Sequence, residues 1–197
     1  MRTRYPKFKT ILIDPPWQER GGGKVVRGAQ KHYPLMNPEE ILETIQNSGV
    51  WNPDMANGCH LYMWVTNNWL FKGGAWLLEQ LDFEYITNLV WTKNRMGLGY
   101  YFRGRHELCL FARPRQARGY SILPSLVRTE DTLIKADDTS IRVHSRKPQD
   151  LYRKIEAVSP GPRLEMFARQ EREGWISWGN DLLKVSNVRE ARSVPIM

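Results

Sequence analysis

The sequence predicts an α/β protein whose mostly parallel β-sheet is covered by helices on both faces. Short apolar segments suited to buried strands alternate with segments of helical periodicity. Several strands end in polar or rigid residues, such as Asp14 after residues 9–13 and Asn67 after residues 60–65. In sheets of this kind, ligands bind beyond the carboxyl ends of the strands. The length of 197 residues suits one compact domain, and we expect residues 1–197 to form it.

The first half of the chain predicts two strands, each followed by a helix. Residues 9–13 read as a short buried strand. Three residues mark the start of the next helix. Asn37 can cap it, Pro38 fits its first turn, and Glu40 stands at the capping-box position. Residues 60–65 form a second apolar strand. We expect a helix over residues 69–81 after it, interrupted at Gly73 and Gly74.

The second half predicts four further strands and one more helix. The strands are residues 85–91, 107–112, 163–168 and 175–178. The helix opens at Lys147-Pro148 and is stopped after Val158 by Ser159-Pro160-Gly161-Pro162. Residues 113–145 are polar and without periodicity, so we expect an irregular insertion that is functional or mobile.

A second mobile loop is expected at residues 18–32, directly after the first strand end. Its Gly21-Gly22-Gly23-Lys24 lacks the spacing of a phosphate-binding loop, and the residue after the lysine is not Ser or Thr. We therefore interpret the segment as a loop that could close over a substrate.

The charge balance favours a polyanionic partner. The chain has 29 Lys and Arg against 21 Asp and Glu, a net charge of +8. Each phosphate that such a surface neutralises releases condensed counterions. Arginines interleaved with aromatic rings also suit phosphates and unstacked bases together, so we expect a nucleic-acid partner, although many basic proteins bind none. The residues are Arg103, Arg105, Arg113, Arg115, Arg118, Arg142 and Arg146, with Tyr100, Tyr101, Phe102 and Tyr120.

Other features of the composition argue against several classes of protein. Cys59 and Cys109 provide no disulfide framework and fit a reducing compartment. The four histidines are scattered, so we expect no metal site. No apolar run approaches the ~18 residues of a membrane span, and the N-terminus lacks the apolar stretch of a signal peptide. We expect a cytoplasmic protein without a membrane partner.

The segment Asp14-Pro15-Pro16-Trp17 places a carboxylate, a rigid backbone and a large ring at one strand end. The prolines fix φ and lack N–H groups, so the carbonyls there are rigid acceptors. A planar ligand could donate from an exocyclic amine to Asp14 and to a proline carbonyl while it stacks on an aromatic face. Two such acceptors favour the pyramidal geometry that frees the lone pair of an adenine amine. The alternative is a tight turn in which Trp17 only packs.

The chain resembles the DPPW-class, MT-A70-like adenine N6-methyltransferases, and it looks most like their bacterial and phage members. The resemblance covers nearly the whole chain in several spaced blocks that keep the family's order. Besides Asp14-Pro15-Pro16-Trp17, the blocks are residues 31–36 (KHYPLM), 61–67 (LYMWVTN), 90–93 (VWTK), 104–110 (GRHELCL), 144–152 (HSRKPQDLY), 159–169 (SPGPRLEMFAR) and 174–181 (GWISWGND).

This resemblance implies a Rossmann-like methyltransferase fold that uses S-adenosylmethionine, with the catalytic motif before the cofactor strand in a permuted, β-class order. It implies transfer of a methyl group to the 6-amino group of adenine in nucleic acid. A compact chain favours DNA over RNA as the substrate. RNA methylation and a catalytically silent nucleic-acid-binding subunit remain alternatives, and a homodimer or heterodimer is compatible with the sequence.

The resemblance also assigns roles to individual residues. Asp14, Pro15, Pro16 and Trp17 form the catalytic loop, and Asp14 also lies beside the cofactor. The resemblance places Tyr33 and Trp64 at the substrate, and we expect Arg103, Arg105 and His106 to contact it as well. The residues expected at the cofactor are Ser145, Lys147, Glu165, Arg169, Asn180 and Asp181. The glycine-rich turn of many methyltransferases is absent at Phe167-Ala168-Arg169, and without the resemblance Lys147-Pro148 would read as a helix start alone.

Overall fold

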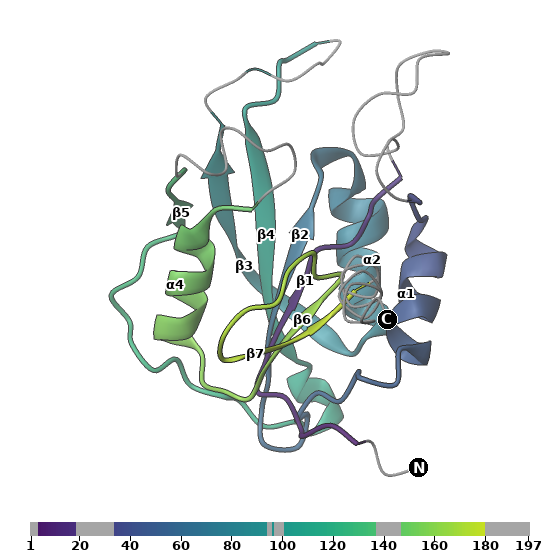
Figure 1. Cartoon of the computed structure of the whole chain (residues 1–197), viewed down its shortest axis with the longest axis vertical. Coiled ribbons are helices and arrows are strands. Elements are labelled where there is room, and N and C mark those ends of the chain that lie inside the picture. Colours follow the sequence, from purple (N-terminus) through teal and green to yellow (C-terminus); the bar gives the residue numbers. More distant parts are fainter. Residues whose placement is uncertain (1–3, 19–33, 94–95, 97–100, 137–146, 180–197) are drawn as a thin grey trace, which may run out of the picture.

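One seven-stranded sheet organises the part of the chain that the computed structural model describes, residues 4–18, 34–93, 96, 101–136 and 147–179 (Figure 1). The strand order is β5-β3-β4-β2-β1-β6-β7. Only β4 runs against its neighbours, so the predicted mostly parallel sheet is confirmed. The strands are β1 (Thr10–Ile13), β2 (His60–Val65), β3 (Phe83–Thr92), β4 (His106–Pro114), β5 (Leu133–Ile134), β6 (Arg163–Met166) and β7 (Trp175–Trp178).

The strands depart from the sequence prediction at their ends. β3 and β4 are longer than expected because they pair as an antiparallel hairpin from Phe83↔Pro114 to Thr92↔His106. β5 was not predicted, since a two-residue edge strand has no detectable period. β6 ends at Met166 rather than residue 168, because Phe167 turns the chain with a left-handed φ of 61°.

The helices form largely where the sequence places them. α1 (Pro38–Asn47) begins with the predicted capping box, in which the Asn37 side chain accepts from Glu40 N and the Glu40 carboxylate accepts from Asn37 N, both at 2.8 Å. The expected helix over 69–81 is divided into a 3₁₀ turn (Asn67–Trp69), a π-helix (Leu70–Ala75) and α2 (Trp76–Gln80). The predicted interruption at Gly73 and Gly74 is the π-helical turn. α4 (Gln149–Val158) follows Pro148 directly.

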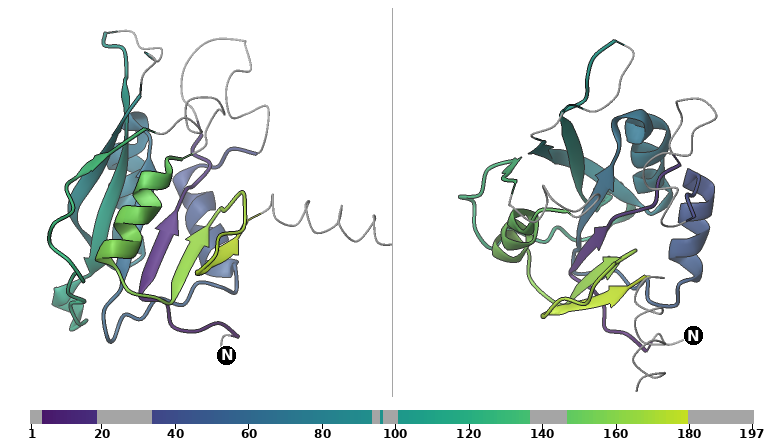
Figure 2. Two further views of the ribbon diagram at one scale, coloured as in Figure 1. Left: turned by 60° about the vertical axis from the view of Figure 1, so that its left-hand side comes forward. Right: turned by 45° about the horizontal axis from the view of Figure 1, so that its top comes forward.

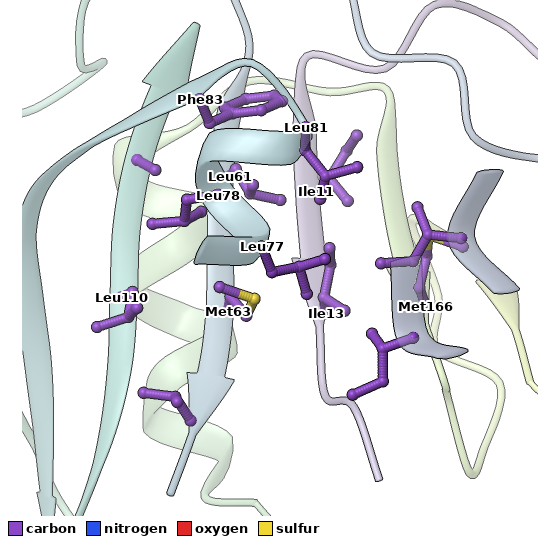
Figure 3. Packing of buried hydrophobic residues seen from close by; sticks show 14 of the residues in the cluster. Ile11, Ile13, Leu61, Met63, Leu77, Leu78, Leu81, Phe83, Leu110 and Met166 are labelled. Atoms are coloured by element: carbon purple, nitrogen blue, oxygen red, sulfur yellow. The ribbon is translucent and has the colours of Figure 1, made fainter. Parts of the chain in front are cut away.

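The two faces of the sheet carry separate hydrophobic clusters. α1 and α2 cover one face, where Leu77 and Leu78 pack against Ile11, Met63 and other strand residues (Figure 3). α4 covers the opposite face with Leu151 and Ile155. Alternate residues of each strand therefore serve different clusters, as in β1, where Ile11 and Ile13 face α2 and Leu12 faces α4. The predicted helices on both faces are confirmed.

The insertion after β4 is irregular where it is described, and it is fastened to α4. Arg113 and Pro114 still belong to β4, residues 116–118 form a 3₁₀ turn, and residues 137–146 lie outside the described part of the chain. Leu126 N donates to Val158 O at 2.8 Å, and the Arg153 guanidinium binds both oxygens of Glu130 at 2.9 Å. Of the other predicted loop, residues 18–32, only Gln18 is described.

The parallel strands direct their carboxyl ends to one edge of the sheet, which we call the carboxyl edge. The arrows of β1, β6 and β7 point toward it, and the β3–β4 hairpin extends beyond it (Figure 2). Residues that follow β1, β2 and β6 therefore lie close together, as the sequence predicts. None of the described helices is long and apolar enough to cross a membrane.

Candidate active site

The Asp14-Pro15-Pro16-Trp17 loop leaves β1 at the carboxyl edge and is fastened by backbone hydrogen bonds. Asp14 N donates to Met166 O of β6 at 3.3 Å, which fixes the point where the loop leaves the sheet. Pro16 O accepts from Met36 N at 2.8 Å, and Pro15 O accepts from Trp17 N at 2.9 Å. The Asp14 side chain, 16% exposed, emerges on the α4 face of the sheet beside Lys147. A carboxylate thus stands at a fixed position at the open end of the strands.

Trp17 differs from the sequence expectation of an open stacking surface, because its ring is buried. The indole lies in the α2-side cluster, stacked at 6.2 Å on Trp69, and its Nε1 donates to Trp64 O at 2.8 Å. Gly73 of the π-helix lies so close that a Cβ there would come within 2.8 Å of Trp17 Cζ3. Trp17 therefore anchors the loop to β2 and to the π-helix.

A group of four charged side chains surrounds the end of this loop. Lys147 Nζ lies 3.1 Å from Asp14 Oδ1 and 3.3 Å from Glu107 Oε2, and Glu107 also pairs with Lys93. Asp14 follows β1 and Lys93 follows β3. Glu107 lies at the start of β4, and Lys147 lies just before α4. The chain Asp14–Lys147–Glu107–Lys93 thus connects four segments across the carboxyl edge.

This arrangement keeps Lys147 and Glu107 ionised. Burial alone would lower the pKa of the Lys147 ammonium, but the charges of Asp14 and Glu107 outweigh it and hold that pKa above its ordinary value. Burial also favours the neutral form of Glu107, yet Lys147 and Lys93 hold the pKa of its carboxyl below the ordinary value. The Lys147 ammonium and the Glu107 carboxylate are therefore both charged at neutral pH.

The Trp64 ring lies beneath the Lys147 ammonium, 5.0 Å from its Nζ, and packs edge-on against Trp91. The side chain is 2% exposed, and its buried Nε1 has no hydrogen-bond partner among the described residues. Sequence reasoning places Trp64 at the target base. In the structure it forms the floor beneath Lys147, with an unused donor.

Glu165 lies on the same face of the sheet as Asp14. In register, Glu165 pairs with Leu12 of β1, and Asp14 follows two residues later. Glu165 Oε1 accepts from Tyr152 Oη at 2.7 Å, whereas the buried Oε2 has no partner among the described residues. Burial raises the pKa of this carboxyl to about 7, although the Tyr152 hydrogen bond and the Arg172 charge oppose the shift.

Two backbone features shape the end of β6. Phe167 takes a conformation with positive φ that an aromatic residue rarely adopts, and its ring packs edge-on against Trp178. Gly179 then approaches so closely that a Cβ there would lie 2.2 Å from Ala168 O. Phe167 therefore makes the turn at the end of β6, and only glycine fits beside it at position 179.

The remaining predicted residues fall into two groups. Arg169, Arg103, Arg105 and His106 are exposed at the carboxyl edge or on the hairpin beyond it. The pKa of Lys147 is raised overall, and the positive charge of Arg169 opposes that rise, consistent with its position near the ammonium. Tyr33, Ser145, Asn180 and Asp181 lie outside the described residues, as do Arg142 and Arg146.

The arginine cluster expected to bind nucleic acid is divided by the structure. Arg113 lies at the opposite end of β4 and Arg115 and Arg118 lie just beyond it. Each pairs with a carboxylate, at 2.6 Å from Glu84, 3.2 Å from Glu79 and 3.5 Å from Asp82. Of the cluster's arginines that the structure describes, only Arg103 and Arg105 stand beside the site. The sequence suggested one basic surface because it does not show that β4, nine residues long, separates the two groups.

Sequence reasoning missed Glu107 and Lys93. Both stand in segments that resemble the family, residues 104–110 and 90–93, but neither has a spacing that indicates its role. Lys93 directly follows β3, and Glu107 lies at the start of β4. These positions indicate that the two residues lie close together only once β3 and β4 are known to pair.

Pockets and ion-binding groups add two observations. An open pocket of about 590 Å³ lies between α4 and the loop after β6, and its lining includes Gln149, Arg172 and Gly174 but not Asp14 or Lys147. Arg172 stacks on the Tyr152 ring at 3.4 Å and so connects this pocket to Glu165. Among the described residues, no three His, Cys, Asp or Glu side chains gather where they could hold a metal.

Comparison with known proteins places this arrangement in a family. The chain is 30% identical over 191 residues to the N6-methyladenosine RNA methyltransferase MTA1 of Cryphonectria parasitica, an alignment that covers 91% of this chain and 53% of that protein. It is 27% identical over 200 residues to human N(6)-adenine-specific methyltransferase METTL4, covering 92% and 39%. It is 25% identical over 191 residues to the human N(6)-adenosine-methyltransferase catalytic subunit METTL3, covering 89% and 28%.

The chain thus spans about half or less of the length of these relatives. They come from a fungus and from human, so an affiliation with bacterial or phage members remains a prediction. The MT-A70 family itself matches over residues 8–181, a range that holds the Asp14 loop, the Lys147 group and Glu165. The chain therefore belongs to the MT-A70 family, whose methyltransferases use S-adenosylmethionine.

Proposed function

We propose that this protein transfers a methyl group from S-adenosylmethionine to the 6-amino group of adenine in nucleic acid. The observation that carries the proposal is the Asp14 carboxylate, held by a rigid loop at the carboxyl edge beside the Lys147 ammonium. That edge is where α/β sheets bind their ligands, and family membership favours this chemistry over other uses of the site.

Asp14 and the prolines would orient the target amine. The amine donates one hydrogen to the Asp14 carboxylate and the other to a proline carbonyl. Pro15 O and Pro16 O each already accept one backbone N–H, but a carbonyl has two lone pairs and retains one for the substrate. Charge is dispersed rather than created when a neutral amine attacks a sulfonium methyl group, so orientation dominates. Well-aligned reactants gain up to about 7–11 kcal/mol in this way.

Several described side chains have the chemistry to bind the cofactor. The Lys147 ammonium suits the methionine carboxylate, and the unpartnered Glu165 Oε2 suits a ribose hydroxyl or an amine. Arg169 stands nearby at the end of β6. The bound cofactor would supply the electrophilic methyl group. We expect Ser145, Asn180 and Asp181 to contribute as well.

Asp14 and Lys147 also favour catalysis over a silent binding subunit, because both functional groups are present and paired. We expect DNA to be the substrate, with RNA as the alternative. The names of the relatives include an RNA methyltransferase and an adenine-specific methyltransferase, so both nucleic acids belong in the test.

The test combines one substitution with three substrates. Wild-type protein and Asp14→Asn are incubated with labelled S-adenosylmethionine and duplex DNA, single-stranded DNA or RNA, and the products are digested to nucleosides. We expect N6-methyladenosine or its deoxy form from the wild type, and at least a 100-fold lower rate from Asp14→Asn, since misplacement by about 1 Å costs that much. Calorimetry should show cofactor affinity within a few fold of wild type.

Asp131→Asn is the matched control, because Asp131 is an exposed aspartate bound to Lys154 on α4, away from the carboxyl edge. An Asp14→Asn variant with full activity would remove the proposed role of the carboxylate. A wild-type protein that labels none of the three substrates would leave the silent-subunit alternative.

A further inference from the structure

The tip of the β3–β4 hairpin carries two adjacent aromatic side chains that the described chain leaves uncovered. Tyr101 is 96% exposed and Phe102 is 91% exposed, and Met96 across the hairpin is 66% exposed. Arg103 and Arg105 follow directly and are exposed too. No carboxylate occurs between Tyr101 and His106. The tip therefore combines flat apolar surface with positive charge only.

The base of the hairpin is fixed relative to the site. Lys93 N donates to Arg105 O at 2.7 Å, and Arg105 Nε donates back to Lys93 O at 3.3 Å. A Cβ on Gly104 would lie 4.0 Å from Asn67 Nδ2, so this limb of the hairpin rests against the turn that follows β2. Glu107, three residues after Gly104, contacts Lys147. The two arms of the hairpin therefore lead directly to Lys93 and Glu107, which belong to the charged group of the site.

The hairpin also projects past the carboxyl edge. The pairing of β2 with β4 ends at Val65↔Leu108, whereas β3 continues with β4 to Thr92↔His106 (Figure 1). Phe102 stands five residue steps before Glu107, a span of at most about 17 Å at ~3.3 Å per residue. At ~3.4 Å per base step, this reach corresponds to about five steps along a nucleic-acid strand. Rings at the tip can therefore touch bases that flank a base held at Asp14.

We propose that this hairpin tip is a nucleic-acid contact that holds the strand open beside the target base. Tyr101 and Phe102 insert against the neighbouring bases, and Arg103 and Arg105 bind the flanking phosphates. The inference rests on the proposed function, because a paired adenine must leave the stack before its amine can reach Asp14. Apolar wedges between base steps and stacked aromatic rings are general means of keeping bases apart. The arginines beside the rings favour nucleic acid over an apolar protein surface as the occupant.

The experiment compares Tyr101→Ala/Phe102→Ala with wild type on duplex DNA and RNA that carry 2-aminopurine at several scattered adenine positions. Fluorescence of 2-aminopurine rises when the base is unstacked. We expect wild type to bind and to raise the fluorescence. The double variant should bind about 5- to 150-fold more weakly for each lost ring that stacks on a base, without the rise. Tyr85→Ala is the control, an exposed aromatic residue near the opposite end of the same hairpin.

A double variant that binds and unstacks like wild type would overturn the inference. So would a wild-type dimer, seen by light scattering, that the double substitution converts to a monomer, because the rings would then be an interface between copies. The two proposals fail separately. A ring-dependent fluorescence rise without any N6-methyladenine product contradicts only the proposed function, whereas methylation of duplex by the double variant at the wild-type rate contradicts only the wedge.

Discussion

At the carboxyl edge, the effect of a substitution on stability depends on the opposite charge that it leaves without a partner. Lys147 is 13% exposed and is balanced by two carboxylates, of which Glu107 also balances Lys93. Removing one partner of such a buried pair leaves the other charge without compensation, at a cost of about 3–5 kcal/mol. We therefore expect Glu107→Gln to lower the free energy of unfolding by about 3 kcal/mol at pH 7, measured by urea denaturation.

The pH dependence of this loss follows from the direction of the shift. The pKa of Glu107 in the folded protein lies below its ordinary value of 4.5, so its contribution is complete above pH 4.5 and is lost as the pH falls through the folded value. The difference between wild type and Glu107→Gln should therefore shrink below pH 4.5. Glu79→Gln is the control, since Glu79 is 61% exposed and its partner Arg115 is 34% exposed, so this pair should matter less. Equal losses in the two variants would contradict the assigned role of Glu107.

Glu165 should show the opposite pH dependence. Its pKa is raised to about 7, so between about pH 4.5 and 7 the folded state binds more protons than the unfolded state, and stability falls as the pH rises. Glu165→Gln should remove this slope and stabilise the protein at pH 8 by up to about 3 kcal/mol, at 1.36 kcal/mol per pKa unit. It should also weaken cofactor binding, because a neutral amide accepts a hydrogen bond less strongly than a carboxylate.

Urea denaturation from pH 5 to 8 and calorimetry with S-adenosylmethionine measure the two effects. Buried His60 contributes with the other sign, since burial lowers its pKa, so only the difference between variant and wild type isolates Glu165. A variant that is more stable and still binds the cofactor with unchanged affinity would contradict the placement of Glu165 in the cofactor site.

At the scale of elements, the π-helix between β2 and α2 supports the Asp14-Pro15-Pro16-Trp17 loop, for which we propose the catalytic role. Its two glycines face different neighbours: a Cβ on Gly73 would lie 2.8 Å from Trp17, and a Cβ on Gly74 would lie 3.0 Å from Val65 Cγ2. Gly73→Ala should displace Trp17 and with it Asp14, and we expect about a 100-fold slower transfer with cofactor affinity nearly unchanged. Gly74→Ala should cost about 1–3 kcal/mol of stability by overpacking and leave the transfer rate within a few fold of wild type.

Single-turnover rates and thermal unfolding of this pair separate positioning from stability. The two variants add the same methyl group to neighbouring positions of one helix, so helix propensity cancels in the comparison. Similar transfer rates in both would show that Trp17 does not position the loop.

Elements were more predictable than contacts between them. The capping box at Asn37 and Glu40 and the break at Gly73-Gly74 follow from local chemistry, and both are confirmed. The burial of Trp17 was not predictable, because a ring beside a carboxylate at a strand end is compatible with stacking on a ligand or packing inward. The indole packs against the distant Gly73, where a Cβ would lie 2.8 Å from Trp17 Cζ3, and this contact is not visible in the local sequence.

At the scale of the whole molecule, the sequence shows how much positive charge there is but not where it faces. Arg103 and Arg105 stand beyond the carboxyl edge, whereas Arg113 lies at the other end of β4 and Arg115 just past it, paired with Glu84 and Glu79. Pairing with a carboxylate neutralises an arginine locally, so it has little charge left for a phosphate. The two groups of arginines lie at opposite ends of β4. The sequence does not show this until β3 and β4 are known to pair as an antiparallel hairpin.

This separation predicts which arginines govern the salt dependence of nucleic-acid binding. Each phosphate contact contributes about 0.9 to the slope of log affinity against log salt on duplex DNA. Arg103→Gln/Arg105→Gln should therefore reduce the slope by about 2, with a similar loss on every sequence tested. Arg113→Gln/Arg115→Gln removes the same formal charge and should leave the slope unchanged. Fluorescence anisotropy from 50 to 200 mM salt measures both, and a slope that falls only in the second variant would place the binding surface at the opposite end of the sheet from Asp14.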